Sequence, residues 1–187
     1  MDIYRGGSKV NILVMTGSAH KNGTSAKMAE EFIKGAQEAG NDVYRFDTAF
    51  KNVHPCLACE KCHNTDKGCV FKDDMEEVNP HLLEADMVVF VSPVYYYGIT
   101  AQIKSVIDRF YANDSLLHGH KKAVLLLTME EKALEAADGC ISTFKDMTRF
   151  LNWEVFGTIV AADSVNLDAL MKTDYPAKVY ALGKSIK

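Results

Sequence analysis

Four of the five cysteines lie in one short segment, with the spacing Cys56-x2-Cys59-x2-Cys62-x6-Cys69. Three cysteines at this interval place three thiolates on one tight loop, which is the arrangement that holds iron–sulfur clusters, and a fourth thiolate completes the ligand set. The segment therefore predicts a metal site. A [4Fe-4S] cluster, a structural zinc ion and thiol–disulfide exchange all remain open at this point. Cys140 stands apart and is expected to be a small core residue.

A second chemically informative segment spans residues 16–25 and reads TGSAHKNGTS. It joins an apolar run to an amphipathic stretch, so its backbone N–H groups and hydroxyls are expected at the start of a helix, where a phosphate binds well. The hydroxyl donors are Ser18, Thr24 and Ser25. The segment lacks the lysine of a Walker A loop, and the chain has no G-x-G-x-x-G sequence, so a mononucleotide fits better than a dinucleotide. A plain N-capping loop is the alternative.

A third segment, residues 92–100, carries three consecutive tyrosines, Tyr95, Tyr96 and Tyr97. Tyrosines on a loop offer flat surfaces on which an isoalloxazine or nicotinamide ring can stack, while backbone N–H groups meet its polar edge. The alternative is that one or two of them pack inward or at a subunit contact. For the loop as a whole, the sequence favours a ring-binding site.

The elements that must position these segments follow from the hydrophobic pattern. Buried strands are predicted at 10–15, 42–46, 87–91, 123–128 and 154–161, and amphipathic helices at 25–39, 73–85, 100–111, 133–151 and from 176 onward. Alternating strands and helices predict an α/β fold with a five-stranded, doubly wound parallel sheet covered by helices on both faces. In such a sheet the ligand crevice lies beyond the carboxyl ends of the strands, where residues 16–25 and 92–100 are expected.

Two helix ends carry charged residues for which the sequence suggests a structural explanation. Asp73 and Glu76 have the spacing of a capping box at a helix start. At the end of the predicted helix 100–111, Lys104 and Asp108 are expected to form a surface ion pair, with Arg109 as a cation near the helix C-terminus.

Composition limits the remaining possibilities. The 187 residues, 48% hydrophobic and 25% charged, predict one globular domain over 1–187 with a cysteine-rich loop at about 51–72. The net charge of −4 and the lack of a basic stripe predict no nucleic-acid partner. The apolar runs are too short to cross a membrane, and Met1 to Ser8 lacks the apolar region of a secretion signal, so a cytoplasmic protein is expected.

Three groups of residues together resemble a known family. They are Gly17-Ser18 with Asn22-Gly23-Thr24-Ser25, Asp73-Asp74-Met75 after the cysteines, and residues 92–102 leading to Ile107-Asp108-Arg109. In these motifs, from about residue 9 to 109, the chain resembles the flavodoxin-like NADPH-dependent FMN reductases, and among them the iron-sulfur flavoproteins. The resemblance implies strand order 2-1-3-4-5 and a homodimer or homotetramer. It also implies hydride transfer from NAD(P)H to FMN and then to a quinone, another small acceptor or a redox protein.

The resemblance also implies a set of site residues. His20 stands where the family usually has a phosphate-binding arginine, and the cysteine pattern would hold a [4Fe-4S] cluster near the flavin. The FMN-binding residues implied are Ser18, His20, Asn22, Gly23, Thr24, Ser25, Pro93, Val94, Tyr95, Tyr96, Tyr97, Gly98 and Thr128. Two alternatives remain: an iron-sulfur flavoprotein that carries electrons without NAD(P)H activity, and a zinc-stabilised, non-enzymatic module.

Overall fold

A parallel sheet of five strands, in the order β2-β1-β3-β4-β5, lies at the centre of the residues that this computed structural model describes, 9–65 and 68–187. The strands are β1 (Asn11–Thr16), β2 (Asp42–Asp47), β3 (Met87–Pro93), β4 (Lys122–Thr128) and β5 (Glu154–Ala161). The predicted fold class and strand order are therefore confirmed. The segment Met1 to Ser8, in which no secretion signal was expected, lies outside the described residues.

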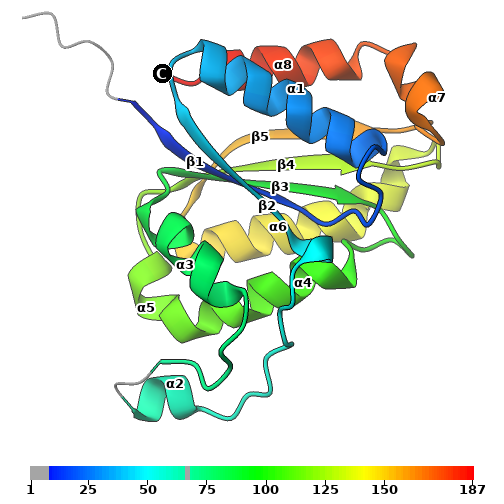
Figure 1. The fold of residues 1–187 in the computed structure, drawn as a ribbon. Helices are drawn as coiled ribbons and strands as arrows, with labels where there is room; N and C mark the ends of the chain where they lie inside the picture. Colours follow the sequence, from blue (N-terminus) through cyan, green and yellow to red (C-terminus); the bar gives the residue numbers. More distant parts are fainter. Residues whose placement is uncertain (1–8, 66–67) are drawn as a thin grey trace, which may run out of the picture.

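Helices cover both faces of this sheet (Figure 1). One face carries α1 (Thr24–Glu38), α7 (Leu167–Met171) and α8 (Tyr175–Lys184). The other carries α3 (Met75–Glu84), α4 (Ala101–Asp108), α5 (Asp114–Leu117) and α6 (Asp138–Leu151). The short helix α2 (Lys61–Asn64) belongs to the cysteine segment, which projects beyond α3 and α5. The remaining short elements are 3₁₀ turns, η1 (Thr48–Phe50), η2 (Arg109–Asn113) and η3 (Leu134–Ala137).

The core is divided by the sheet into two apolar clusters. One contains Phe90 and Phe144 and lies under α3, α4 and α6, whereas the other contains Met28 and Phe32 and lies under α1 and α8. The strand β3 is buried on both faces from its first residue to Ser92. This burial explains its uninterrupted apolar sequence, because a central parallel strand has helices on each side.

Two predicted helices differ from the observed ones at their ends. The helix expected over 100–111 is α from Ala101 to Asp108 and continues as η2, and the helix expected over 133–151 starts with η3 before α6. Tighter 3₁₀ turns are common at helix ends, where some backbone groups have no i→i+4 partner. The hydrophobic period alone does not distinguish the two helix types.

The structure corrects the predicted roles of two charged residues. Asp73 accepts a hydrogen bond from the Met75 N–H at 3.2 Å, but Glu76 pairs with Lys72 and does not complete a capping box. Arg109 is not an exposed cation at a helix end; it is 3% exposed and forms an ion pair with Asp73 at 2.7 Å. The prediction for Arg109 was wrong because it considered only neighbours along the same helix, whereas Asp73 is 36 residues away. The surface pair between Lys104 and Asp108 is confirmed.

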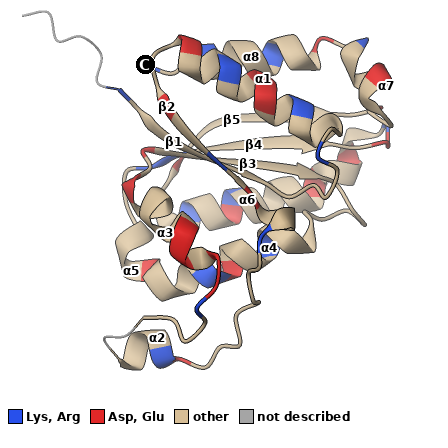
Figure 2. Cartoon of the chain, in the orientation of Figure 1, with Lys and Arg blue, Asp and Glu red and all other residues tan. Residues whose placement is uncertain are grey.

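Residues of both charge signs are interspersed along the helices (Figure 2). Neighbouring opposite charges form ion pairs such as Lys27–Glu31 on α1 and Lys178–Asp174 at the start of α8. Among residues 9–65 and 68–187, no helix combines the length and apolar character that a membrane span requires.

Candidate functional site

Thr128, at the end of β4, joins two of the segments singled out in the sequence. Its hydroxyl lies 2.7 Å from the Ser25 hydroxyl and accepts a hydrogen bond from Thr24 at 3.2 Å. Its carbonyl accepts the N–H of Val94 at 2.9 Å. The structure therefore brings the start of α1, the segment after β3 and the end of β4 together at one edge of the sheet.

A second set of contacts ties residues 16–25 to residues 92–100. The Thr100 hydroxyl donates to the Gly17 carbonyl at 2.8 Å, and the Thr100 N–H donates to the Ser92 hydroxyl at 3.1 Å. Both Thr100 and Ser92 are buried. The two loops are thus held at a defined separation by buried hydrogen bonds.

The loop before α1 is a tight turn that leaves the helix start open. The Ser18 hydroxyl accepts the His20 N–H at 3.1 Å, and the Gly23 N–H donates to the His20 carbonyl at 3.2 Å. Gly23 is the N-cap, and within the described chain α1 has neither a side-chain cap nor an acidic residue in its first turn. The first N–H groups of a helix lack intrahelical partners, so this end suits an anion.

The structure distributes the predicted phosphate-binding residues between surface and interior. Ser18 and Ser25 are buried, Gly23 and Thr24 are half-buried, and His20 and Asn22 are exposed. The Ser25 hydroxyl already pairs with Thr128.

The tyrosines form a two-residue turn. Tyr95 and Gly98 exchange backbone hydrogen bonds of 2.9 and 3.0 Å, while Tyr96 and Tyr97 between them have left-handed φ angles of 47° and 63°. Such a conformation costs a non-glycine residue about 1–3 kcal/mol. The Tyr96 side chain is fully exposed and Tyr97 is 69% exposed, so neither packs into the core of this chain.

A hollow of about 660 Å³ lies beside this turn, at the carboxyl ends of β3, β4 and β5. This volume falls in the usual range of small-molecule sites, about 300–1,000 Å³. Three segments of the chain border it: the tyrosine turn, the loop after β4 and the loop after β5. The lining residues are Val94, Tyr96, Tyr97, Met129, Glu130, Glu131, Lys132, Ala136, Asp163 and Val165.

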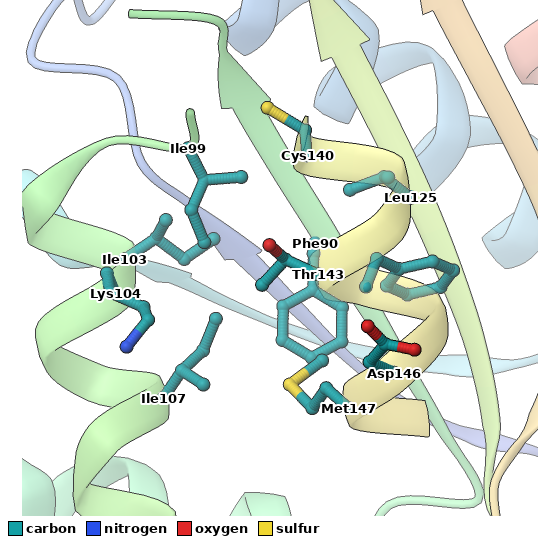
Figure 3. Close-up of a pocket in the computed structure, with 11 residues that line it drawn as sticks. Phe90, Ile99, Ile103, Lys104, Ile107, Leu125, Cys140, Thr143, Asp146 and Met147 are labelled. Carbon is teal, nitrogen blue, oxygen red and sulfur yellow. The ribbon is translucent and has the colours of Figure 1, made fainter. Parts of the chain in front are cut away.

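A separate apolar cavity of about 380 Å³ lies between α4 and α6 (Figure 3). Ile99, Ile103 and Ile107 face Phe90 and Met147 across it. Its charged lining residues are Lys104 and Asp146, and Lys104 already pairs with Asp108 on its own helix. A cavity with such apolar walls does not match a phosphate-bearing nucleotide.

The four clustered cysteines line one small cavity, of about 20 Å³. The loop that carries Cys56, Cys59 and Cys62 turns sharply, with left-handed backbone at Ala58 and Glu60. Burial raises the pKa of the Cys62 thiol, and the charges of the other three cysteines raise it further. Within the described residues, no three histidine, cysteine or acidic side chains gather as closely as a single metal ion requires.

Arg109 closes one side of the cysteine cavity. Its Nη1 donates to Asp73 at 2.7 Å and to the His54 carbonyl at 2.8 Å, and its guanidinium lies 5.2 Å from the Phe71 ring centroid. Burial raises the pKa of the Asp73 carboxyl, but hydrogen bonds from Arg109 and from the N–H groups of His54 and Met75 bring it below its usual value. The pair therefore stays ionised at neutral pH.

The cysteine cavity and the tyrosine turn lie at opposite ends of α4. The turn ends just before α4 begins, whereas the cavity is lined by residues 109, 111 and 112, directly after the helix. Eight helical residues span about 12 Å. Within this chain, the expected metal site is therefore separated from the expected flavin ring by the length of a helix.

The model of the NADPH-dependent FMN reductase family matches residues 10–166. The chain belongs to this family. It is 37% identical to an iron-sulfur flavoprotein of Archaeoglobus fulgidus over 106 residues, which is 56% of this chain and 45% of that protein. It is 34% identical to an iron-sulfur flavoprotein of Methanocaldococcus jannaschii over 116 residues, 59% of this chain and 57% of that one. The chain spans about half the length of these curated relatives.

Solved structures share the fold of this FMN reductase family member. An NAD(P)H:quinone oxidoreductase from Methanothermobacter marburgensis superposes with a TM-score of 0.74 at 18% identity, covering 95% of this chain and 96% of that one. A flavone reductase superposes with a TM-score of 0.71 at 18% identity, covering 92% and 60%. At this identity the likeness concerns the fold alone.

The structure of this family member adds residues that sequence reasoning missed. Lys132, Asp163 and Val165 line the hollow, and Arg109 lines the cysteine cavity. The first three follow the ends of β4 and β5, so their position after predicted strands was an available signal. For Arg109 no spacing rule was available, since its partner Asp73 is 36 residues away.

Proposed function

We propose that this chain binds FMN across the ends of β1, β3 and β4 and carries electrons from NAD(P)H through it. The acceptor is a quinone, another small molecule or a redox protein. The observation that carries this proposal is the junction at Thr128, which places the open start of α1 beside the hollow with the exposed tyrosines. The family match is in keeping with it. In this proposal residues 1–187 act as a single FMN-binding domain.

Each part of the proposed site has a separate task. The phosphate lies at the start of α1, where Ser18, Asn22, Thr24 and the N–H groups of the first turn donate hydrogen bonds to its oxygens. The ring lies against residues 93–98, and Tyr96 and Tyr97 shield it from water. FMN itself supplies the hydride and electron chemistry, so the protein needs no side-chain acid or base for that step.

We propose further that the four cysteines hold a [4Fe-4S] cluster. Two observations support the fit: the four thiols line one cavity, and the buried Nε of Arg109 in its wall has no hydrogen-bond partner within the described residues. Four thiolates are the ligand set of such a cluster. Relatives named iron-sulfur flavoproteins point in the same direction.

Two other functions use the same features. In the first, the chain is an electron carrier that never reacts with NAD(P)H, which the names of the curated relatives favour. In the second, a zinc ion stabilises a module that has no enzymatic activity. Zinc is the weaker candidate, because zinc sites usually combine two cysteine pairs from separate segments.

The absorbance spectrum of anaerobically prepared protein distinguishes these functions. We expect flavin bands together with a broad iron–sulfur shoulder, and bleaching of the flavin bands on addition of NADPH or NADH. Flavin that NAD(P)H does not bleach supports the electron carrier instead. One zinc per chain without acid-labile sulfide supports the zinc module.

The cysteine assignment has its own variant. Cys59→Ala leaves three thiolates, so iron and sulfide should fall while FMN remains bound at the other end of α4. Cys140→Ala is the matched control, since Cys140 is buried in the core beside Tyr97 and outside the cysteine cavity. Equal iron content in the two variants contradicts the cluster assignment.

We infer that the protein works in the cytoplasm as a homodimer or homotetramer and does not bind nucleic acid. The exposed side chains of Tyr96 and Tyr97 support oligomers, because aromatic side chains are enriched at subunit contacts. Light scattering of the FMN-loaded protein tests the oligomeric state. A strictly monomeric protein contradicts it.

A further inference from the structure

Arg109 is a buried cation in the wall of the cysteine cavity. It is 3% exposed and lines the cavity together with Cys56, Cys59, Cys62 and Cys69. Burying a guanidinium is unfavourable unless charged partners compensate it. The single carboxylate that pairs with it, Asp73, is not among the lining residues of the cavity.

The hydrogen bonds of Arg109 show an unequal distribution. Nη1 and Nη2 donate to Asp73, and Nη1 also donates to the His54 carbonyl. Nε is buried and has no partner in the part of the chain that the structure describes. The guanidinium therefore lies in the wall of the cavity that the four cysteines line and still has an unused donor.

We propose that Arg109 sets the reduction potential of the metal group held by the four cysteines. This inference rests on the proposed cluster. The four thiolates would hold the cluster, and when bound it would take up single electrons from flavin reduced by NAD(P)H, so that each electron would add one negative charge beside Arg109 without a bond made or broken. A fixed cation in the wall of the cysteine cavity would stabilise that added charge, which raises the potential. Asp73 keeps the guanidinium in place.

The test measures potentials of full-length, anaerobically reconstituted protein by titration with dithionite and redox mediators. Arg109→Gln removes the cation, and Asp73→Asn removes the opposing charge but leaves the cation. Lys104→Gln is the matched control, because it removes one positive charge from an exposed site on the neighbouring helix α4. Arg109→Lys keeps the charge without the planar donors.

We expect Arg109→Gln to make the equilibrium constant for reduction about tenfold less favourable. For one electron this lowers the midpoint potential by about 59 mV. Asp73→Asn should raise it, Arg109→Lys should change it less than Arg109→Gln, and Lys104→Gln should leave it nearly unchanged. Shifts of Arg109→Gln and Asp73→Asn in the same direction, or a shift no larger than that of Lys104→Gln, overturn the proposal.

Two further outcomes are decisive. The Arg109→Gln variant leaves the Asp73 carboxylate buried and unpaired, and this alone can prevent it from holding iron. In that case the double variant, Arg109→Gln with Asp73→Asn, removes the unpaired carboxylate. The midpoint potential of the double variant should lie below that of Asp73→Asn alone. Failure of this double variant to hold iron makes Arg109 a structural residue and overturns the inference. Iron and sulfide are first measured in the unsubstituted protein, and their absence there contradicts the cluster itself before any variant is compared.

Discussion

The hydroxyl oxygens of Ser25 and Thr128 lie 2.7 Å apart, although 103 residues separate them in the sequence. Both side chains are 1% exposed. Each hydroxyl can donate one hydrogen bond and accept others, so the pair satisfies two polar groups that burial would otherwise penalise. The contact fixes the first turn of α1 against the end of β4. It thereby also fixes the distance between the loop before α1 and the hollow beside the tyrosines.

Removal of one hydroxyl of this pair should destabilise the protein more than removal of both. Thr128→Val leaves the Ser25 hydroxyl buried without its partner, which should lower the free energy of unfolding by about 1–3 kcal/mol. Combining Thr128→Val with Ser25→Ala should recover part of that loss. Urea unfolding of the two single variants and the double variant measures the coupling, and strictly additive losses contradict it.

An acidic residue at the start of α1 should separate helix stability from phosphate binding. Thr24→Asp places a negative charge near the helix N-terminus, which favours the helix by about 0.3–1 kcal/mol. The same charge repels the FMN phosphate, so we expect FMN affinity to fall at least tenfold while the apoprotein keeps its melting temperature.

Thr24→Asn is the matched control, because it has nearly the same shape without the charge. Quenching of flavin fluorescence measures the affinity of each variant. Equal FMN affinity in Thr24→Asp and Thr24→Asn places the phosphate somewhere other than the start of α1.

Gly139 at the start of α6 supports the tyrosine turn. A Cβ at this position would lie 2.7 Å from the Tyr97 carbonyl oxygen. Real Cβ atoms do not come this close to a backbone atom, so either the helix or the turn would have to move. Gly139→Ala should therefore shift the turn, lower the free energy of unfolding by about 1–3 kcal/mol, and weaken FMN binding. Ser142→Ala, exposed on the same helix, is the control. Unchanged stability and FMN affinity in Gly139→Ala would show that the turn does not depend on this contact.

The Asp73–Arg109 pair should make the stability of the apoprotein sensitive to acid. The Asp73 pKa is lower in the folded protein than its usual value, because the hydrogen bonds from Arg109 and two N–H groups outweigh burial. A carboxyl with a lowered folded-state pKa contributes stability that is present above its unfolded pKa of about 3.9 and is lost as the pH falls through the folded value.

Asp73→Asn should therefore be less stable than the unsubstituted protein at neutral pH, and the difference should narrow below about pH 4. Urea unfolding at a series of pH values measures how the free energy of unfolding changes with pH in each protein. Asp146→Asn, at an exposed ion pair on α6, is the control and should leave the pH dependence unchanged. Parallel curves for Asp73→Asn and the unsubstituted protein contradict the assignment.

Sequence patterns predicted the fold because the relevant information is local. Each strand is a short apolar run and each long helix has apolar residues at helical spacing, so elements and their order follow from neighbours along the chain. The same locality explains the error at Arg109, which was assigned only the role of a cation near the end of its own helix, whereas its partner Asp73 is 36 residues away. At Glu76 the observed partner is local, but Lys72 lies four residues before it and replaces the capping-box contact.

By itself, the sequence determined the parallel sheet, the family, and the three segments in which chemistry is expected. Only the tertiary structure decided that Thr128 joins the first turn of α1 to the segment after β3, that residues after β5 border the hollow, and that Arg109 closes the cysteine cavity at the far end of α4. The physical reason is that spacing along the chain governs backbone conformation over a few residues. Contacts such as Ser25–Thr128 and Asp73–Arg109 instead depend on which loops the packed helices and strands bring to the same place.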